Sequence, residues 1–400
     1  MNILFLTLAR IDDISQKSIY NDLLRKFKNE GHEVFVITPT ERRYKENSAV
    51  SIQDGIRILK VKTYNIQKTN IVEKGIGTIS IQRQYLQGLK KYFSDVRFDL
   101  VLYSTPPITF TKVIKFVKER DNARTYLLLK DIFPQNAVDI GMLKENGFIH
   151  KYFRKLEKEL YKISDTIGCM SPANADFVVK HNQFLDKRKI ELNPNTISTD
   201  SRMIVSESKL DIKEKYNISP EAITFMYGGN LGKPQGIDFL INVLEANADR
   251  ADVFFFIVGS GTEYDKVDQW FKANNPKNAK LISSLPKNDY QELLQSCDVG
   301  LVFLDHRFTI PNFPSRILDY MQLGMPIIAA TDKNTDVGKI MVENGFGLWC
   351  ESKKAEDFNN LIDLVKDKEQ RKKLGDKGHQ YLTKNYDVQV SYDKIIKRNV

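Results

Sequence analysis

Two successive series of short apolar runs alternate with amphipathic stretches along the chain, and this alternation restricts the fold more than any other feature. In the first series the runs 2–8 and 33–38 flank residues 16–31, whose apolar side chains have helical spacing. Apolar runs of this length predict buried strands, and the strand–helix–strand order predicts a parallel sheet covered by helices on both faces. The same alternation continues through predicted strands at 55–61, 100–104, 125–129 and 166–170 and predicted helices at 79–93, 109–120 and 151–162.

A polar stretch, residues 193–208, interrupts the pattern and has the composition of a linker. The alternation then restarts, with predicted strands at 224–227, 253–258, 280–283, 299–304 and 326–330 and predicted helices at 236–247, 289–296 and 315–323. We therefore expect an α/β protein made of two Rossmann-like, doubly wound domains that face a cleft. The expected domains are residues 1–200 and 201–384, with a C-terminal helix at about 385–400 that packs back on the first domain.

Composition excludes several classes of protein. The chain of 400 residues is 42% hydrophobic, which is enough for large cores and excludes a disordered protein. No apolar run approaches the roughly 18 residues of a membrane span, and the N-terminus has neither a basic leader nor a small-residue cleavage site, so we expect a cytoplasmic protein. Cys169, Cys297 and Cys350 are far apart in apolar surroundings, which predicts reduced core residues rather than disulfides or a metal cluster.

Positive charge is concentrated in the first half of the chain. Residues 1–200 contain 33 Lys and Arg against 23 Asp and Glu, a balance of +10, whereas residues 201–400 contain 27 and 28, a balance of −1. This asymmetry predicts that the first half faces an anionic partner, either nucleic acid, a phosphate-bearing substrate or a membrane surface. A solvated basic surface without a dedicated partner is the alternative. Nucleic acid is disfavoured, because the sequence contains no recognised nucleic-acid-binding module.

The segment 310–329 contains the most informative pattern. Pro314 and Ser315 predict a helix start, with Ser315 at the N-cap or in the first turn. A helix N-terminus beside Arg316 predicts a pyrophosphate site. Asp319 lies one turn later on the same face, where a carboxylate can accept both hydroxyls of a ribose. An ordinary capped helix with an exposed aspartate is the alternative.

Two glycine turns follow predicted strands in the same half. Their candidate ligand-contacting residues are Gly229, Asn230, Lys233, Gly259 and Gly261. Glycine lets the backbone approach a ligand closely, and lysine supplies a point cation for phosphate. Neither turn has the spacing of a Walker loop or of a GxGxxG fingerprint, so a tight strand-to-helix turn is the alternative for each. Because the carboxyl ends of parallel strands share one edge of a sheet, we expect both turns to lie beside the 314–319 segment.

Together these three segments resemble the donor half of the GT-B glycosyltransferases of family 4, a large retaining group. Residues 314–329 (Pro-Ser-Arg-Ile-Leu-Asp-Tyr-Met-Gln-Leu-Gly-Met-Pro-Ile-Ile-Ala) match the helix and strand of that family closely, and residues 342–348 resemble its following Gly-rich turn. The resemblance covers essentially the whole chain. It is strongest to bacterial enzymes that assemble capsule or O-antigen repeat units, including amino-sugar transferases.

The donor half departs from the family pattern at several positions. The family commonly has two glutamates, of which the second is Asp319 here and the first falls on Pro311, which cannot act as an acid. The family's basic pair falls on two neutral residues, Asn230 and Gln235. Lys233, between them, is the expected substitute for that pair, helped by Arg316 or Arg307.

The N-terminal half resembles the same subgroup at residues 130–137 (Lys-Asp-Ile-Phe-Pro-Gln-Asn-Ala), which match its Asp-x-x-Pro-(Glu/Gln) segment. The resemblance implies that Asp131 lies beside the reaction centre as an acceptor ligand or base. A structural aspartate that caps the next helix is the alternative. Arg10, in the loop after the first predicted strand, is expected to face the cleft and contact an acceptor phosphate.

The resemblance implies a retaining transferase that moves a sugar, expected to be an N-acetylated amino or deoxyamino sugar, from a UDP-sugar to a lipid-diphosphate-linked saccharide. The implied catalytic residues are Asp131, Lys233 and Arg316. The implied donor-binding residues are Gly229, Asn230, Lys233, Gly259, Gly261, Pro314, Ser315, Arg316 and Asp319. We expect no cofactor besides the donor and no metal, because the five histidines form no metal-spaced pair and the sequence has no Asp-x-Asp motif.

The basic half would then contact the acceptor diphosphate and, as a peripheral protein, the anionic inner face of the cell membrane. The candidate contact regions are residues 151–162 and 60–91. Two other functions remain open. One is a nucleotide-sugar 2-epimerase of the same architecture, and the other is a non-catalytic subunit that binds a nucleotide sugar, which Pro311 leaves possible.

Overall fold

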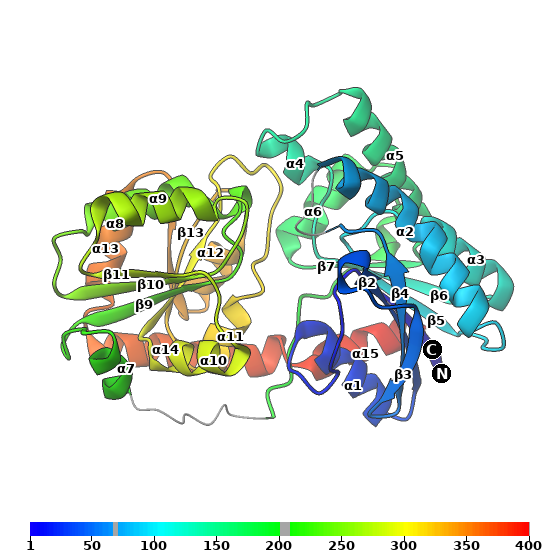
Figure 1. Ribbon diagram of the computed structural model, residues 1–400, viewed down its shortest axis with the longest axis horizontal. Coiled ribbons are helices and arrows are strands. Elements are labelled where there is room, and N and C mark those ends of the chain that lie inside the picture. Colours follow the sequence, from blue (N-terminus) through cyan, green and yellow to red (C-terminus); the bar gives the residue numbers. More distant parts are fainter. Residues whose placement is uncertain (67–70, 201–208, 400) are drawn as a thin grey trace. The chain divides into compact units, whose positions relative to one another are not determined.

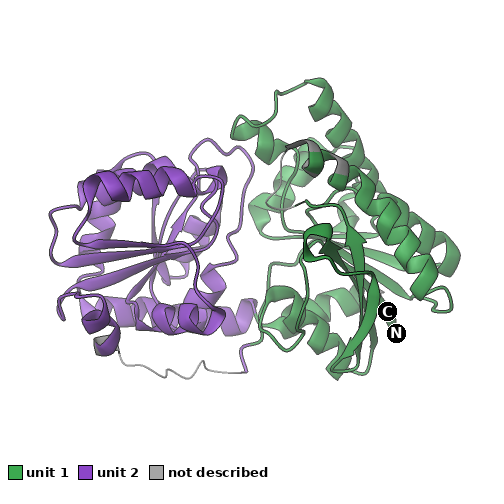
Figure 2. Ribbon diagram, viewed as in Figure 1, with its two compact units in different colours: residues 1–198, 387–400 green, residues 199–386 purple. Residues whose placement is uncertain are grey.

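The computed structural model describes residues 1–66, 71–200 and 209–399. The chain forms two compact units, residues 1–198 with 387–400 and residues 199–386 (Figure 2). Each unit is built on one largely parallel sheet, which confirms the predicted α/β class with two doubly wound domains. Residues 201–208 of the predicted linker and 67–70 of the second basic region lie outside the described residues.

The N-terminal unit contains an eight-stranded sheet in the order β3-β4-β2-β1-β5-β6-β7-β8. Its strands are β1 (Asn2–Leu6), β2 (Glu33–Glu41), β3 (Ala49–Gln53), β4 (Ile56–Thr63), β5 (Leu100–Ser104), β6 (Arg124–Leu129), β7 (Thr166–Cys169) and β8 (Ile190–Leu192). All neighbours are parallel except β3 and β4. The buried residues of β1, β5 and β6 leave no polar face, because helices cover the sheet from both sides.

The helices of this unit are α1 (Ile19–Asn29), α2 (Ile71–Tyr92), α3 (Thr111–Asp121), α4 (Gln135–Asp139), α5 (Phe148–Ile163), α6 (Pro172–His181) and α15 (Val388–Asn399). Figure 1 shows α1 and α15 on one face of the sheet and α2, α3 and α5 on the other. The C-terminal helix α15 is held there by Tyr392, whose ring centroid lies 5.4 Å from that of Phe27 and whose hydroxyl lies 3.1 Å from Nε2 of His32.

The C-terminal unit contains a six-stranded parallel sheet in the order β11-β10-β9-β12-β13-β14. Its strands are β9 (Ile223–Gly228), β10 (Val253–Val258), β11 (Ala279–Ile282), β12 (Val299–Phe303), β13 (Ile327–Thr331) and β14 (Gly347–Glu351). Its helices are α7 (Lys209–Lys215), α8 (Ile237–Ala246), α9 (Tyr264–Asn274), α10 (Lys287–Ser296), α11 (Ile317–Gln322), α12 (Val337–Glu343), α13 (Ala355–Leu364) and α14 (Lys368–Asn385). Figure 1 shows α8 and α9 on one face and α10, α11 and α14 on the other.

Two expectations about composition can be compared with the structure. Cys169, Cys297 and Cys350 are buried and none forms a disulfide, as predicted. Within the described ranges, every helix is too short or too polar to cross a bilayer.

Candidate active site

The candidate donor site lies at the carboxyl edge of the C-terminal sheet, where the chain leaves β9 toward β10 and leaves β12 toward β13. Strands β9 and β12 pair over only two residues before they diverge. The buried ring of Tyr320 packs against Gly300 at this point, and its hydroxyl lies 3.1 Å from the carbonyl oxygen of Met226 and 3.2 Å from that of Leu301. Tyr320 therefore satisfies carbonyls that the diverging ladder leaves open, and it fixes the switch point at which doubly wound sheets bind ligands.

Arg316 occupies the middle of this edge. Its Nη2 donates to Oε1 of Gln235 at 2.7 Å, and its guanidinium carbon lies 4.5 Å from the ring centroid of Tyr227. Its Nη1 is buried and has no hydrogen-bond partner, and no carboxylate in the described part of the chain forms an ion pair with it. A guanidinium cannot lose its proton in a protein, so the fold holds a positive charge here that only neutral groups contact. This arrangement favours an anionic ligand.

Backbone hydrogen bonds join the two glycine turns to each other next to Arg316. The backbone N–H of Gly229 donates to the Val258 carbonyl at 2.9 Å, and that of Leu231 donates to the Ser260 carbonyl at 2.9 Å. A Cβ on Gly259 would collide with the carbonyl oxygen of Gly229, and Gly229 itself has a φ of +134° and lies against the guanidinium of Arg316. Gly259 and Gly261 were both predicted to contact the donor. Each has a packing role that requires glycine, because a Cβ on Gly261 would likewise collide with the carbonyl oxygen of Leu231.

Tyr290 at this edge interacts electrostatically with both Asp319 and Arg316. Tyr290 is in the first turn of α10, and its hydroxyl reaches Gly228 so closely that a side chain at Gly228 would collide with it. The pKa of Tyr290 is raised to about 12, mainly by burial and also by the charge of Asp319, while the charge of Arg316 acts in the opposite direction. The edge thus combines a cation and a carboxylate from the start of α11 with a phenol from α10.

Lys233 provides a second cation at the same edge. It begins the short 3-10 helix η3 (Lys233–Gln235) and is exposed, and its ammonium forms no ion pair or hydrogen bond with the residues that the structure describes. The carbonyl oxygen of Pro234 in η3 accepts from the backbone N–H of Asp305 at 3.0 Å, which ties η3 to the loop after β12. Arg307, in that loop, is instead paired in bidentate fashion with Asp305, at 2.8 Å and 2.6 Å.

The start of α11 differs from the prediction. The helix begins at Ile317 with Arg316 at its N-cap and no side-chain capping bond, so the predicted start at Ser315 was wrong. Pro314 and Ser315 form the turn that leads into the helix, and their carbonyls accept from Ile317 and Leu318. The preceding loop is fixed by a bond of 3.0 Å from the N–H of Asn312 to Oγ1 of Thr335, so tertiary contacts rather than a cap define this helix start.

The N-terminal sheet places Asp131 at its own carboxyl edge, immediately after β6. Its two carboxylate oxygens each accept from Nδ2 of Asn136 at 2.8 Å, and its backbone N–H donates to Oγ1 of Thr105 at 3.3 Å. Burial raises the pKa of Asp131 to about 6, although the hydrogen bonds from Asn136 and the Ile132 N–H act in the opposite direction. Helix α4 has Pro134 at its N-cap, so Asp131 does not cap it. Burial likewise lowers the pKa of Lys130 to about 7.

Arg10 lies in the loop after β1 among groups that already neutralise it. Its Nε donates to both carboxylate oxygens of Asp12 at 2.8 Å, and its Nη2 donates to Glu46 at 3.0 Å. Its guanidinium also lies 3.8 Å from the ring centroid of Tyr44. An acceptor phosphate would have to compete with two carboxylates here, so the predicted contact between Arg10 and acceptor stays a prediction.

Comparison with known proteins covers both units. Residues 19–201 match the family model described as Glycosyltransferase Family 4, and residues 208–381 match the model described as Glycosyl transferases group 1. A probable glycosyltransferase of Pseudomonas aeruginosa, WbjE, is 24% identical over 335 residues, which is 82% of this chain and 80% of that protein.

The chain is a family 4 glycosyltransferase of the GT-B type.

Solved structures share the fold of this glycosyltransferase. HepE of Anabaena, solved with UDP-glucose, has a TM-score of 0.70 at 14% identity and covers 99% of this chain and 98% of its own. WaaG, described as a glycosyltransferase of lipopolysaccharide biosynthesis, has a TM-score of 0.66 at 13% identity and covers 98% of each chain. Likeness at this level of identity shows the fold alone.

Several residues of this glycosyltransferase site were not predicted from the sequence. Tyr290 was missed because α10 carries no glycine turn, although it follows β11 at the same sheet edge as the other segments. Gln235 was noted only as a neutral replacement, whereas the structure shows it as the hydrogen-bond acceptor of Arg316. In the portion of the chain that the structure describes, no group of three or more His, Cys, Asp or Glu residues could hold a metal ion.

Proposed function

We propose that this glycosyltransferase moves a sugar from a UDP-sugar to a lipid-diphosphate-linked saccharide, with retention of anomeric configuration and without a metal ion. The proposed pathway is assembly of capsule or O-antigen polysaccharide, and the proposed sugar is an N-acetylated amino or deoxyamino sugar. Two proteins of the same fold support the nucleotide and the pathway, since HepE was solved with UDP-glucose and WaaG is involved in lipopolysaccharide biosynthesis.

The observation that carries the proposal is the buried charge of Arg316. Its orphaned Nη1 and the absence of a carboxylate partner in the described residues leave a desolvated cation that a donor diphosphate would neutralise. Lys233, exposed on η3, would add a second cation at the outer side of the same edge. Two cations placed where the leaving diphosphate gains charge stabilise the transition state more than the ground state.

The remaining donor contacts follow from the geometry of the edge. Asp319, one turn beyond Arg316, would accept hydrogen bonds from the two ribose hydroxyls. Asn230 is exposed on the first glycine turn, and the backbone of Gly229 can approach the donor because no side chain intervenes. Tyr290 lies against Gly228, interacts with the charge of Asp319 and would form one wall of the nucleotide pocket.

In the proposed reaction the bond between the anomeric carbon and the diphosphate oxygen breaks while the acceptor hydroxyl oxygen attacks from the same face. The electron pair of the broken bond leaves with UDP, and the acceptor proton passes to the departing phosphate. Asp131 in its ionised form would accept a hydrogen bond from the acceptor hydroxyl and orient it. Its pKa of about 6 keeps the carboxylate ionised at neutral pH.

The acceptor and the location of the protein belong to the same proposal. A lipid-linked acceptor requires an enzyme at the membrane surface, and the +10 balance of residues 1–200 suits both a diphosphate and anionic lipids. We therefore propose a cytoplasmic protein that is peripheral at the inner face of the cell membrane and does not bind nucleic acid.

The direct test is release of UDP from a panel of UDP-sugars with lipid-diphosphate acceptors in the presence of EDTA. Acceptor-dependent turnover that EDTA does not reduce, with a product of retained configuration, supports the proposal. Donor interconversion without any acceptor would instead show a 2-epimerase. Donor binding without turnover by the purified chain would leave a non-catalytic subunit as the function.

A further inference from the structure

The corner between α4 and α5 exposes a cluster of large apolar side chains. Phe148, the first residue of α5, is 89% exposed, which is the largest value among the large hydrophobic residues that the structure describes as exposed. Met142 is 59% exposed, Ile149 is 56% exposed and Tyr152 is 39% exposed. These four residues lie within positions 142–152 and form an apolar tip, and soluble surfaces rarely expose so many large apolar side chains close together without a partner.

The fold holds this apolar tip (Met142, Phe148, Ile149 and Tyr152) in place. The backbone N–H of Met142 donates to the Ala137 carbonyl at 2.8 Å, and the N–H of Asn146 donates to Nδ1 of His150 at 3.0 Å. Behind the tip, the ring of Phe153 packs edge-on against Phe133 at 4.9 Å. Exposure of the tip is therefore a built feature of the corner.

A row of lysines continues from the apolar tip along α5. The basic row consists of Lys151, Lys155, Lys158 and Lys162. All four are exposed, and none forms an ion pair with a residue in the described ranges. Their spacing of four, three and four residues places their backbone positions along one stripe of the helix, from which the side chains extend to either side. The opposite side of α5 is buried, with Glu157, Leu160 and Tyr161 in the protein interior.

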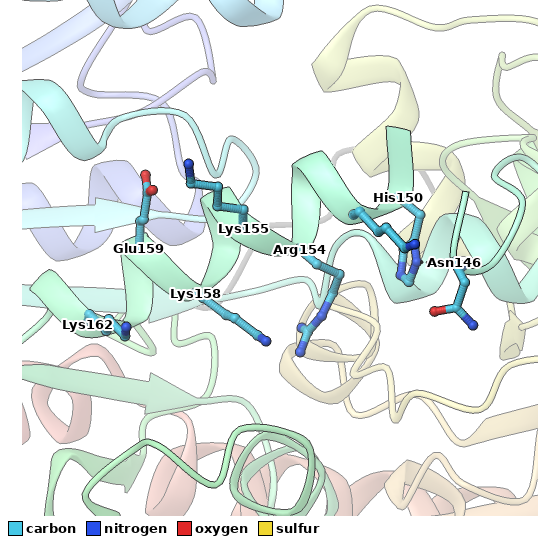
Figure 3. Close-up of a pocket in the computed structure, with 8 residues that line it drawn as sticks. Asn146, His150, Arg154, Lys155, Lys158, Glu159 and Lys162 are labelled. Carbon is cyan, nitrogen blue, oxygen red and sulfur yellow. Dashed lines mark hydrogen bonds between the residues drawn. The ribbon is translucent and has the colours of Figure 1, made fainter. Parts of the chain in front are cut away.

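The basic row borders a shallow depression of about 540 Å³. It is lined by Asn146, His150, Lys151, Arg154, Lys155, Lys158, Glu159 and Lys162 (Figure 3). Figure 3 shows these side chains distributed along α5, with Lys155 and Glu159 on one side and Arg154 and Lys158 on the other. The lining contains five cations and one carboxylate, that of Glu159. Of the five cations, Arg154 is paired with the buried Glu157, which does not line the depression.

We propose that the apolar tip and the basic row together dock the protein on an anionic lipid bilayer. The apolar side chains would enter the boundary between headgroups and acyl chains, while the lysine ammoniums contact headgroup phosphates. A nucleic acid would use the lysines but not an exposed phenylalanine and isoleucine, whereas a bilayer uses both. Because the buried side of α5 stays packed on the unit, only its first turn inserts, which makes the attachment reversible.

This inference deepens the proposed function, because a lipid-linked acceptor requires the enzyme to reach the membrane. It assigns that contact to α5 rather than to the basic half as a whole. It can fail independently, since binding to lipid is measured without any substrate.

The test is co-sedimentation of the full chain with vesicles of phosphatidylcholine alone and of phosphatidylcholine with phosphatidylglycerol. The apolar variant is Phe148→Ser with Ile149→Ser, and the basic variant is Lys151→Gln with Lys155→Gln and Lys158→Gln. Each lysine near an anionic surface contributes about fivefold in binding, so we expect the basic variant to lose at least about tenfold. We expect a similar loss in the apolar variant, and a loss of binding by the wild type in 0.5 M salt, about the concentration that screens surface charge within a few ångströms.

Matched controls on other surfaces separate docking from general surface chemistry. Ile52→Ser changes an apolar residue on β3 that is 68% exposed, and Lys368→Gln with Lys372→Gln and Lys373→Gln removes three exposed lysines of α14. Both controls should bind vesicles like the wild type. The inference would be overturned if the wild type did not co-sediment with anionic vesicles, or if the α5 variants co-sedimented as much as the wild type. Release of UDP with a water-soluble acceptor analogue by the same α5 variants shows separately whether the proposed function stands.

Discussion

Each sheet of this glycosyltransferase has an ionisable group at its carboxyl edge that burial affects strongly, Asp131 in the N-terminal unit and Arg316 in the C-terminal unit, and the two groups respond differently. Asp131 at the N-terminal edge can escape the cost of burial by taking up a proton, and its pKa rises to about 6. Arg316 at the C-terminal edge cannot give up its proton, so its charge stays and its Nη1 stays without a partner in the described chain. One edge therefore keeps its positive charge at neutral pH, whereas the other can change its charge near neutral pH.

Substitution of Asp131, the group that titrates at the N-terminal edge, should have the largest effect on activity. We expect Asp131→Asn to lower kcat about 10²- to 10⁴-fold, because a neutral amide is a weaker partner than a carboxylate for the hydroxyl group of the acceptor saccharide. In the wild type, kcat/KM should rise with pH through about 6 as Asp131 ionises, and the variant should lose this acidic limb. The measurement is the pH profile of UDP release, with Asp139→Asn on α4 as the matched control.

The same pKa makes a prediction for stability that separates catalysis from folding. A carboxyl whose pKa is raised in the folded state stabilises the fold below its unfolded pKa, and this contribution is lost as pH rises through about 6. Urea denaturation should therefore show that Asp131→Asn gains stability relative to the wild type between pH 4 and pH 7.5. A variant that loses both activity and stability at pH 7.5 would mean that Asp131 is structural.

Removal of the Arg316 charge at the C-terminal edge should have the next largest effect on activity. We expect Arg316→Met to lower kcat/KM about 10²- to 10³-fold, since the departing diphosphate loses a charge-assisted donor in a desolvated site. Arg307→Met is the matched control, because Arg307 lies in the same loop but is already paired with Asp305. Steady-state kinetics on both variants measure the difference, and equal losses would contradict the assignment to Arg316.

Asp319 sharpens the comparison, because it tests whether the ribose lies one turn from the cation. We expect Asp319→Ala to raise the donor KM about 10- to 100-fold, as for a lost hydrogen bond to a charged group. The wild type should discriminate against a 2′-deoxyribose donor, and the variant should treat both donors alike. A variant with normal donor KM would refute the ribose contact.

The smallest expected effect concerns the scaffold under the cation. Tyr320→Phe removes the hydroxyl that reaches the carbonyls of Met226 and Leu301, and we expect a loss of about 1–3 kcal/mol in the free energy of unfolding. Urea denaturation measures this loss, with the exposed Tyr152→Phe as the control. Equal stability of the two variants would show that the diverging strands do not depend on Tyr320.

The sequence predicted the regular parts of both units because burial on two faces produces apolar runs that are easily recognised. Strand β10 was predicted with its observed bounds for this reason, since all six of its residues are buried. Strand β3 was not predicted, because it lies at the sheet edge with most residues exposed and pairs antiparallel with β4. Edge strands carry little burial pattern for a sequence to reveal.

The candidate site was predictable where it depends on local chemistry and not where it depends on tertiary contacts. Arg316 and Asp319 stand in one recognisable segment, so the resemblance named both. The helix start predicted at Ser315 was wrong and Tyr290 was missed for the same reason, since residues distant in sequence determine both. Thr335 accepts a hydrogen bond from the loop before α11, and the Tyr290 hydroxyl lies against Gly228. The strand-to-helix turns and their shared sheet edge were predicted from the sequence, but the hydrogen bonds that join the two glycine turns were not.

The central claim is that the buried charge of Arg316 receives the diphosphate of the donor. Calorimetric titration of the wild type and Arg316→Met with UDP and with uridine, in EDTA, tests it most directly. The claim predicts that the substitution weakens UDP binding about 10- to 100-fold and leaves uridine binding nearly unchanged, because uridine lacks the charge that Arg316 would neutralise. Equal affinity of both proteins for UDP, or a parallel loss for UDP and uridine, would contradict it.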